Sequence, residues 1–277
     1  MNIHSALLHG KNFLRCESQG LRSAEILLQF TLNVSRAHLY AHSEQILSDI
    51  QMGLYQNLIQ QRHQGVPIAY LTKQRSFWKF DLMVSSDTLI PRPETEILIE
   101  QILNLTDLNQ TYSLLDLGTG SGAIALAIAC ERPHWQIKAC DESMEALCIA
   151  KHNAQLLQLE SIQFIQSDWF EEFSEQRFDI IVANPPYLAN HDPHLKEGDL
   201  RYEPKSALIS GPDGLDDLRF IINHSCKHLN KHGLLIVEHG FEQSGSVLEL
   251  FNSNGYHSIQ SWSDLQGHLR ICGGRKY

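Results

Sequence analysis

From residue 112 to the C-terminus, short apolar runs alternate with longer segments whose apolar residues recur at helical spacing. This alternation is typical of a doubly wound sheet, in which helices cover both faces of mostly parallel strands. Only a short turn, 263–267, separates the last two strand segments, so we expect the final strand to run antiparallel at or near the sheet edge. Strands are predicted near 112–117, 135–140, 162–167, 178–183, 233–239, 256–262 and 268–274, and helices near 121–131, 143–157, 213–230 and 241–254.

The N-terminal part of the chain has a different pattern, in which apolar residues follow helical spacing throughout. Ser35 and Ser43 are the predicted N-caps of two further helices, the second covering 44–62. Residues 76–84 then alternate between polar and apolar, as a strand or hairpin does. The predicted domains are a helical docking domain at 1–73, a β-hairpin linker at 74–90 and the α/β domain at 91–277.

Composition limits the possible functions. The net charge of −10 argues against a broad nucleic-acid-binding surface, and residues 1–75 are mildly basic, which fits a protein partner better than a duplex. No apolar run reaches the length of a membrane span, and the N-terminus lacks the charged and apolar regions of a signal peptide. The six cysteines form no CxxC pair. We therefore expect a cytosolic protein with reduced thiols, no membrane association and no metal site.

The most distinctive short motif is Asn184-Pro185-Pro186-Tyr187, which directly follows the apolar run 178–183. Proline has no N–H to donate, so two consecutive prolines end the strand and leave the carbonyls before them without ladder partners. The stiff loop that results presents a side-chain amide, a free carbonyl and an aromatic ring. It is suited to accept hydrogen bonds from an NH2 group, whereas the structural alternative is a proline-stiffened turn with a buried tyrosine.

Three other strand ends carry residues that suit a nucleotide-like ligand. The turn Gly118-Thr119-Gly120-Ser121-Gly122 joins a strand to a helix, and its glycines let the backbone approach a ligand closely. Asp141 ends the next strand, where a carboxylate can accept both hydroxyls of a ribose. Asp168 and Trp169 end the third strand, where an adenine would lie, although Trp169 could equally be a packing residue.

We expect these three strand ends to converge on one crevice at the carboxyl edge of the sheet, where open α/β folds bind ligands, with the motif at Asn184 as a fourth signal. NAD explains the glycine turn and Asp141, but it does not explain the motif that begins at Asn184. S-adenosylmethionine explains all four, with S-adenosylhomocysteine as the product. Seven strands ending in a hairpin also describe the Rossmann-like sheet of class I methyltransferases better than an NAD-binding one.

The chain resembles the release-factor glutamine methyltransferases of the PrmC/HemK type over nearly its whole length. That family methylates the side-chain amide of the glutamine in the GGQ motif of class I peptide chain release factors. The C-terminus departs slightly from the family pattern, with Arg270-Ile271-Cys272 in a strand-like run where Arg-Val-Thr is common. The resemblance rests on the segments 90–96, 116–127, 184–187, 202–204, 211–215 and 238–240.

The resemblance implies cofactor contacts at Gly118 to Gly122, Asp141, Trp169 and Asn184, and substrate contacts at Asn184 to Tyr187. Asn184, Pro185 and Tyr187 are the expected catalytic residues, with Asn184 and the Pro185 carbonyl accepting the two N–H groups of the glutamine. Arg92 is a candidate partner for a carboxylate of cofactor or substrate, although fixing its own loop is the alternative. Glu238 and His239 end the fifth strand near the crevice, where a structural hydrogen bond is favoured over catalysis.

Three other functions remain open at the level of sequence. A methyltransferase of nucleic-acid amino groups shares the Asn-Pro-Pro-Tyr motif, but it would normally have a basic recognition surface and base-stacking aromatics. A protein that only binds S-adenosylmethionine has no need to polarise an amide. The target glutamine could also lie in another protein, such as a ribosomal one.

Overall fold

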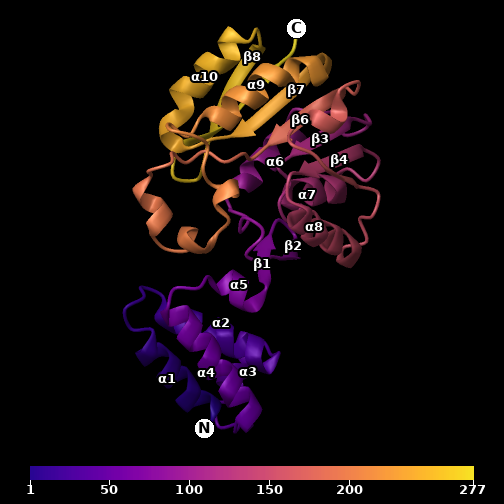
Figure 1. The fold of residues 1–277 in the computed structure, drawn as a ribbon. Coiled ribbons are helices and arrows are strands. Elements are labelled where there is room, and N and C mark those ends of the chain that lie inside the picture. Colours follow the sequence, from indigo (N-terminus) through magenta and orange to yellow (C-terminus); the bar gives the residue numbers. More distant parts are fainter. The chain divides into compact units, whose positions relative to one another are not determined.

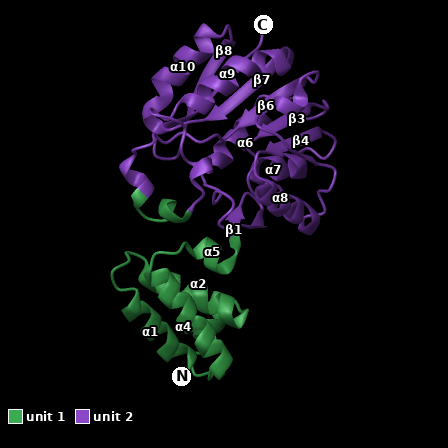
Figure 2. Cartoon of the chain, viewed as in Figure 1, with its two compact units in different colours: residues 1–74, 196–202 green, residues 75–195, 203–277 purple.

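The computed structural model describes the whole chain, Met1–Tyr277 (Figure 1). Its residues group into two compact units (Figure 2). Unit 1 contains Met1–Gln74 and Lys196–Tyr202, and unit 2 contains Arg75–Leu195 and Glu203–Tyr277. The short segment Lys196–Tyr202 was not anticipated from the sequence, which placed all of 91–277 in one domain; the domain boundaries stay a prediction. No helix is both long enough and apolar enough to cross a membrane.

Unit 1 is built around five helices with one apolar core. Its helices are α1 (Ile3–Phe13), α2 (Gly20–Leu32), α3 (Arg36–Ala41), α4 (Asp49–His63) and α5 (Ile68–Thr72). The buried residues recur at helical spacing, as in Ala24, Leu27 and Leu28, and pack around the buried ring of Tyr55. The Tyr55 hydroxyl donates to the carbonyl of Ala6 at 3.2 Å, so the polar end of this ring has a partner inside the core.

One predicted helix cap in unit 1 is confirmed and the other is wrong. The Ser35 side chain accepts a hydrogen bond from the His38 N–H and begins α3. Ser43 does not cap the next helix. Ser48 does, in a reciprocal capping box with Gln51, and α4 therefore begins five residues later than expected.

The segment Lys196–Tyr202 belongs to unit 1 through polar contacts with the end of α4. Arg62 forms ion pairs with Glu17 and with Asp199. Arg201 and the Tyr202 hydroxyl both donate to the Gln64 carbonyl, at 2.9 and 2.6 Å. These bonds satisfy a carbonyl at the helix C-terminus that has no partner within the helix.

Unit 2 contains the expected mixed α/β sheet. The strand order is β5-β4-β3-β6-β7-β9-β8, and all pairs are parallel except those made by β9. The last strand is antiparallel, as predicted, and lies one place in from the edge. The seven strands are β3 (Ser113–Leu117), β4 (Gln136–Asp141), β5 (Gln163–Gln166), β6 (Phe178–Ala183), β7 (Leu229–Glu238), β8 (His257–Ser263) and β9 (Leu269–Arg275).

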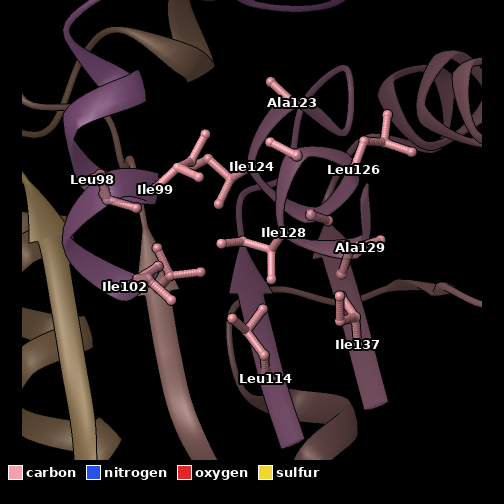
Figure 3. Close-up of a cluster of buried hydrophobic side chains, with 14 of the residues drawn as sticks. Leu98, Ile99, Ile102, Leu114, Ala123, Ile124, Leu126, Ile128, Ala129 and Ile137 are labelled. Atoms are coloured by element: carbon pink, nitrogen blue, oxygen red, sulfur yellow. The ribbon is translucent and has the colours of Figure 1, made fainter. Parts of the chain in front are cut away.

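Alternation along each strand divides the core into two layers. Leu114 and Ile180 face one layer, and the residues that follow them, Leu115 and Ile181, face the other. The first layer is covered by three helices, and Figure 3 shows how side chains of α6 and α7 meet over β3 and β4. These helices are α6 (Thr95–Asn104), α7 (Ala123–Glu131) and α8 (Met144–Leu156), while α9 (Asp216–His228) and α10 (Ser244–Ser253) cover the second layer.

A small hairpin precedes the sheet, formed by β1 (Gln74–Phe77) and β2 (Phe80–Met83). It confirms the hairpin expected from the alternation at 76–84. Asn153 of α8 ties it to the glycine turn, because its amide bonds both main-chain groups of Met83 and also donates to the Ser121 carbonyl at 2.9 Å. Asn153 is buried, so these bonds fix the turn against the hairpin.

The departure from the family pattern at the C-terminus leaves the antiparallel β8–β9 pairing in place, although its register shifts at two points. Asp264 accepts main-chain hydrogen bonds from Gln266 and His268, both at 2.9 Å, and pairs with Arg270 at 3.2 Å. The side chain of Asp264 is almost fully buried. One carboxylate thus organises the turn, and the strand that follows it completes the sheet.

Candidate functional site

A cavity of about 540 Å³ lies at the carboxyl ends of the central strands of unit 2. Its volume falls in the range of small-molecule sites. Its position is the one at which open α/β sheets bind ligands. The predicted site residues that line it are Gly118, Thr119, Gly120, Ser121, Asp141, Asp168, Trp169, Asn184 and Pro186, whereas Gly122, Pro185, Tyr187 and Arg92 do not.

The glycine turn needs a backbone that other residues rarely adopt. Gly118, Gly120 and Gly122 all have positive φ, at 68°, 57° and 85°. A Cβ on Gly120 would meet no protein atom within 4 Å, so the space beside it is open to a ligand. A Cβ on Gly122 would instead lie 3.0 Å from Leu126, which shows that this glycine allows helix packing.

A buried carboxyl group, that of Asp116, stabilises the turn through hydrogen bonds. It accepts hydrogen bonds from the Thr119 hydroxyl at 2.6 Å and from the Ala125 N–H at 3.2 Å. Burial raises the pKa of Asp116 to about 7. Because Asp116 does not line the cavity, we assign it to shaping the turn rather than to contacting a ligand.

Asp141 is the last residue of β4 and lies beside the glycine turn. Its Oδ2 accepts from the Gly120 N–H at 2.8 Å, and its Oδ1 accepts from the Ser143 N–H at 3.0 Å. Each carboxylate oxygen keeps a second lone pair, so the group can still accept two hydroxyl donors from a ligand. Burial raises the pKa of Asp141, and such donors would stabilise its charged form.

Trp169 lies beside the glycine turn in the lining of the cavity. The Trp169 ring would lie 3.4 Å from a Cβ on Gly118, and it also packs against the second core layer. Both alternatives weighed for Trp169 thus have structural support. Asp217 and Phe220, one turn apart on α9, line the same cavity. Sequence analysis missed them, although their place in the first turns of a helix after a strand-end loop was a usable signal.

Asn184 is fixed at the end of β6 by a residue that sequence analysis also missed. Its Nδ2 donates to the Thr95 hydroxyl oxygen at 3.1 Å, and Thr95 donates to Glu238 at 2.7 Å. The Asn184 Oδ1 is buried and has no hydrogen-bond partner in the protein. A buried acceptor without a partner is costly, by about 1–3 kcal/mol, so this oxygen is available to a ligand donor.

The rest of the tetrapeptide is divided, since Pro186 lines the cavity and Tyr187 does not. The Tyr187 hydroxyl donates to Glu238 at 3.3 Å, and burial raises the pKa of this tyrosine. The Tyr187 carbonyl accepts from the Gln243 side chain at 2.9 Å. The carbonyl of Pro185 accepts no main-chain hydrogen bond. Pro186 lies in the cavity wall, so the loop offers the cavity an amide oxygen beside a proline ring.

Arg92 has a partner within unit 2. It forms an ion pair with the fully buried carboxylate of Glu203, which also accepts from the Ile90 N–H at 3.0 Å. This arrangement matches the loop-fixing alternative. The role of Arg92 in binding a substrate stays a prediction.

Comparison with known proteins identifies the family. The family model "Methyltransferase small domain" matches residues 93–198, and "PrmC N-terminal domain" matches residues 5–72. A release factor glutamine methyltransferase of Salmonella typhimurium is 43% identical over 275 residues, which are 99% of each chain. The chain belongs to the release factor glutamine methyltransferase family. Its relatives in that family include proteins of Xylella fastidiosa, 47% identical over 91% of this chain and 92% of theirs, and of Escherichia coli, 42% identical over 95% of both.

Solved structures agree on the fold of this family member. A methyltransferase from Pyrococcus furiosus superposes with a TM-score of 0.54 at 16% identity, covering 73% of this chain and 91% of its own. The 16S rRNA N2 G1207 methyltransferase of Thermus thermophilus, in complex with AdoMet and guanosine, gives 0.52 at 17% identity over 74% and 50%. The predicted class I methyltransferase fold, the family resemblance and the assignment as a methyltransferase are confirmed.

Proposed function

We propose that this protein transfers a methyl group from S-adenosylmethionine to the side-chain amide nitrogen of the glutamine in the GGQ motif of class I peptide chain release factors, and so modulates translation termination. The observation that carries the proposal is the buried Asn184 Oδ1 without a partner at the edge of the cavity. Relatives that align with nearly the whole chain are named release factor glutamine methyltransferases, which supports the choice of substrate.

The cavity has residues that suit three parts of the methyl donor, which are its ribose, its adenine and its amino-acid part. Asp141 would accept the ribose hydroxyls, because both of its oxygens keep free lone pairs. Trp169 and Phe220 offer rings, and Asp168 offers a carboxylate, for the adenine. Gly120 leaves room for the amino-acid part beside the turn. When bound, the sulfonium would supply an activated methyl group.

The protein's own contribution to the reaction is positioning and charge stabilisation. An amide nitrogen is a poor nucleophile, because its lone pair is delocalised into the carbonyl. Asn184 Oδ1 and the Pro185 carbonyl would accept the two N–H groups of the glutamine and stabilise the positive charge that grows on nitrogen. Tyr187 would support the loop. Positioning of this kind contributes about 7–11 kcal/mol to lowering a barrier.

Two further features support a protein substrate and a cytosolic setting. The mildly basic helical region suits docking of a protein partner, for which we propose class I release factors. All six cysteines are free, as in a reducing compartment, and we propose the cytosol as the place of action. We propose no metal for the reaction, because the donor is already activated.

The substrate is tested by mass spectrometry of purified class I release factors after incubation with the enzyme and S-adenosylmethionine. One added methyl group on the glutamine of the GGQ peptide is expected. Ribosomal proteins and ribosomal RNA are treated in parallel. Transfer to either of them, with an unmodified GGQ peptide, would overturn the choice of substrate and leave the chemistry of the site intact.

Asn184→Ala tests the catalytic assignment. Removing one acceptor from a transition state lowers turnover by about 100- to 1,000-fold. Affinity for S-adenosylhomocysteine, measured by calorimetry, should fall much less, because Asp141 and Trp169 remain. Normal turnover in this variant would show that Asn184 does not accept a hydrogen bond from the glutamine amide during catalysis.

A further inference from the structure

The ends of β6 and β7 bring two polar residues level on the same face of the sheet. These strands are parallel, with Ala183 opposite Val237, so the next residues, Asn184 and Glu238, lie side by side. Two-residue alternation places both on the face covered by α6. Thr95 is the first residue of α6 and bonds to each of them. Three elements therefore form one hydrogen-bonded chain beneath the catalytic loop.

The chain of hydrogen bonds has a direction. An ionised carboxylate can only accept, so Thr95 must donate its single hydroxyl proton to Glu238. The Thr95 oxygen is then free only to accept, and it accepts from the amide NH2 of Asn184. An amide that points its nitrogen at Thr95 must point its oxygen the other way. That oxygen is the buried Oδ1 without a partner.

We propose that Thr95 and Glu238 are positioning residues that fix the side-chain amide of Asn184 with its oxygen toward the substrate. This inference rests on the proposed role of Asn184 as the acceptor of the glutamine NH2. Without the relay the Asn184 amide could turn over, and it would then present two donors to a substrate that is itself a donor. The acceptor role requires one of two orientations, and the relay selects it.

The surroundings of Glu238 are consistent with an acceptor-only role. It is fully buried and receives two donors, because the Tyr187 hydroxyl bonds the oxygen that Thr95 leaves free. Arg270 on β9 favours the charged form, whereas Glu94 before α6 disfavours it. Burial dominates and raises the pKa of Glu238 to about 7. A proton on Oε2 would compete with the Thr95 hydroxyl, whereas a proton on Oε1 would leave Oε2 free to accept from it, so only the ionised form fixes the direction of the relay.

The variants that test the relay change its chemistry with little change of shape. Thr95→Val removes the hydroxyl, and Thr95→Ser keeps it. Glu238→Gln replaces an acceptor-only group by one that can also donate, so the direction is no longer fixed. Thr106→Val is the matched control, because Thr106 makes a similar hydroxyl bond, of 2.7 Å to Ile102, at the other end of α6.

With a purified class I release factor as substrate, Thr95→Val is expected to lower kcat about 10-fold, as one misdirected hydrogen bond implies, with little change in KM. Thr95→Ser should recover most of the loss, and Thr106→Val should behave as the unmodified protein. Because ionised Glu238 fixes the direction of the relay, kcat of the unmodified protein should rise through about pH 7. This rise should be absent from Glu238→Gln. In the substrate-free Thr95→Val variant, NMR should show faster solvent exchange of the Asn184 side-chain NH2 than in the unmodified protein. That signal is assigned by its absence from Asn184→Ala.

A double-mutant cycle separates this inference from the proposed function. If Thr95 acts through Asn184, then Thr95→Val should cost nothing further in a chain that already carries Asn184→Ala. Multiplied losses would overturn the relay and leave the role of Asn184 intact. Normal turnover of Asn184→Ala alone would instead overturn the proposed function. An equal loss in Thr95→Ser and Thr95→Val would also contradict the relay, since the hydroxyl would then not be the group that matters.

Discussion

Asp141→Asn is the sharpest test of the donor site, because the substitution keeps the shape of the side chain and changes one oxygen into an NH2. In the protein, the two oxygens accept from the Gly120 and Ser143 N–H groups, at 2.8 and 3.0 Å. In the proposed role of Asp141, the remaining lone pairs would face the two hydroxyls of a ribose. The asparagine amide can satisfy only one of these N–H groups, and it presents its nitrogen to one hydroxyl.

The expected effect follows from the loss of one charge-assisted hydrogen bond. Such a bond contributes about 1.5–3 kcal/mol, which corresponds to a factor of about 10 to 150 in a dissociation constant. Isothermal calorimetry with S-adenosylhomocysteine measures this directly and does not depend on turnover. The titration is made at slightly alkaline pH, because burial raises the pKa of Asp141 and the carboxyl should be fully ionised.

Asp179→Asn provides the matched control. Asp179 accepts three hydrogen bonds, from the Ser113 N–H and hydroxyl and from Asn230, at the end of the sheet away from the cavity. The substitution should lower the melting temperature and leave the affinity unchanged. Equal affinity of Asp141→Asn and the unmodified protein would refute the ribose role. An equal loss in both variants would show that general destabilisation explains the effect.

Two predictions concern stability. Gly10→Ala should lower the free energy of unfolding by about 1–3 kcal/mol, because the new Cβ would lie 2.2 Å from the Tyr55 hydroxyl. Gly53→Ala on α4 meets no atom within 4 Å and should raise the free energy of unfolding by up to about 1 kcal/mol. Thermal unfolding that ranked the two variants in the opposite order would contradict this packing. Burial raises the pKa of Glu238 from 4.5 to about 7, so between these values the folded protein keeps a proton that the unfolded chain has lost. Stability should therefore fall as pH rises across that interval, and this group contributes at most about 1.4 kcal/mol per pH unit to the fall. Glu238→Gln should make that fall shallower without abolishing it, since Asp116 acts in the same direction, and an unchanged slope would count against a buried, proton-binding Glu238.

The sequence was a good guide wherever a local pattern determines structure. Alternating segments predicted all seven strands, and strand polarity then predicted that Asp141, Asp168 and Asn184 would meet at one edge. The failed cap at Ser43 was a local error of choice, because the signal for Ser48, a glutamine three residues later, was present in the sequence.

What the sequence could not provide was the partner of each polar group. Thr95 lies 89 residues from Asn184 and 143 residues from Glu238, and no periodicity links them. The motif predicted that Asn184 would end a strand and accept a hydrogen bond from a substrate, but an asparagine amide that turns over presents donors instead. In the proposed relay, a hydroxyl from one helix and a carboxylate from the next strand fix the orientation of this amide. The proposed catalytic role of the tetrapeptide therefore depends on residues outside it.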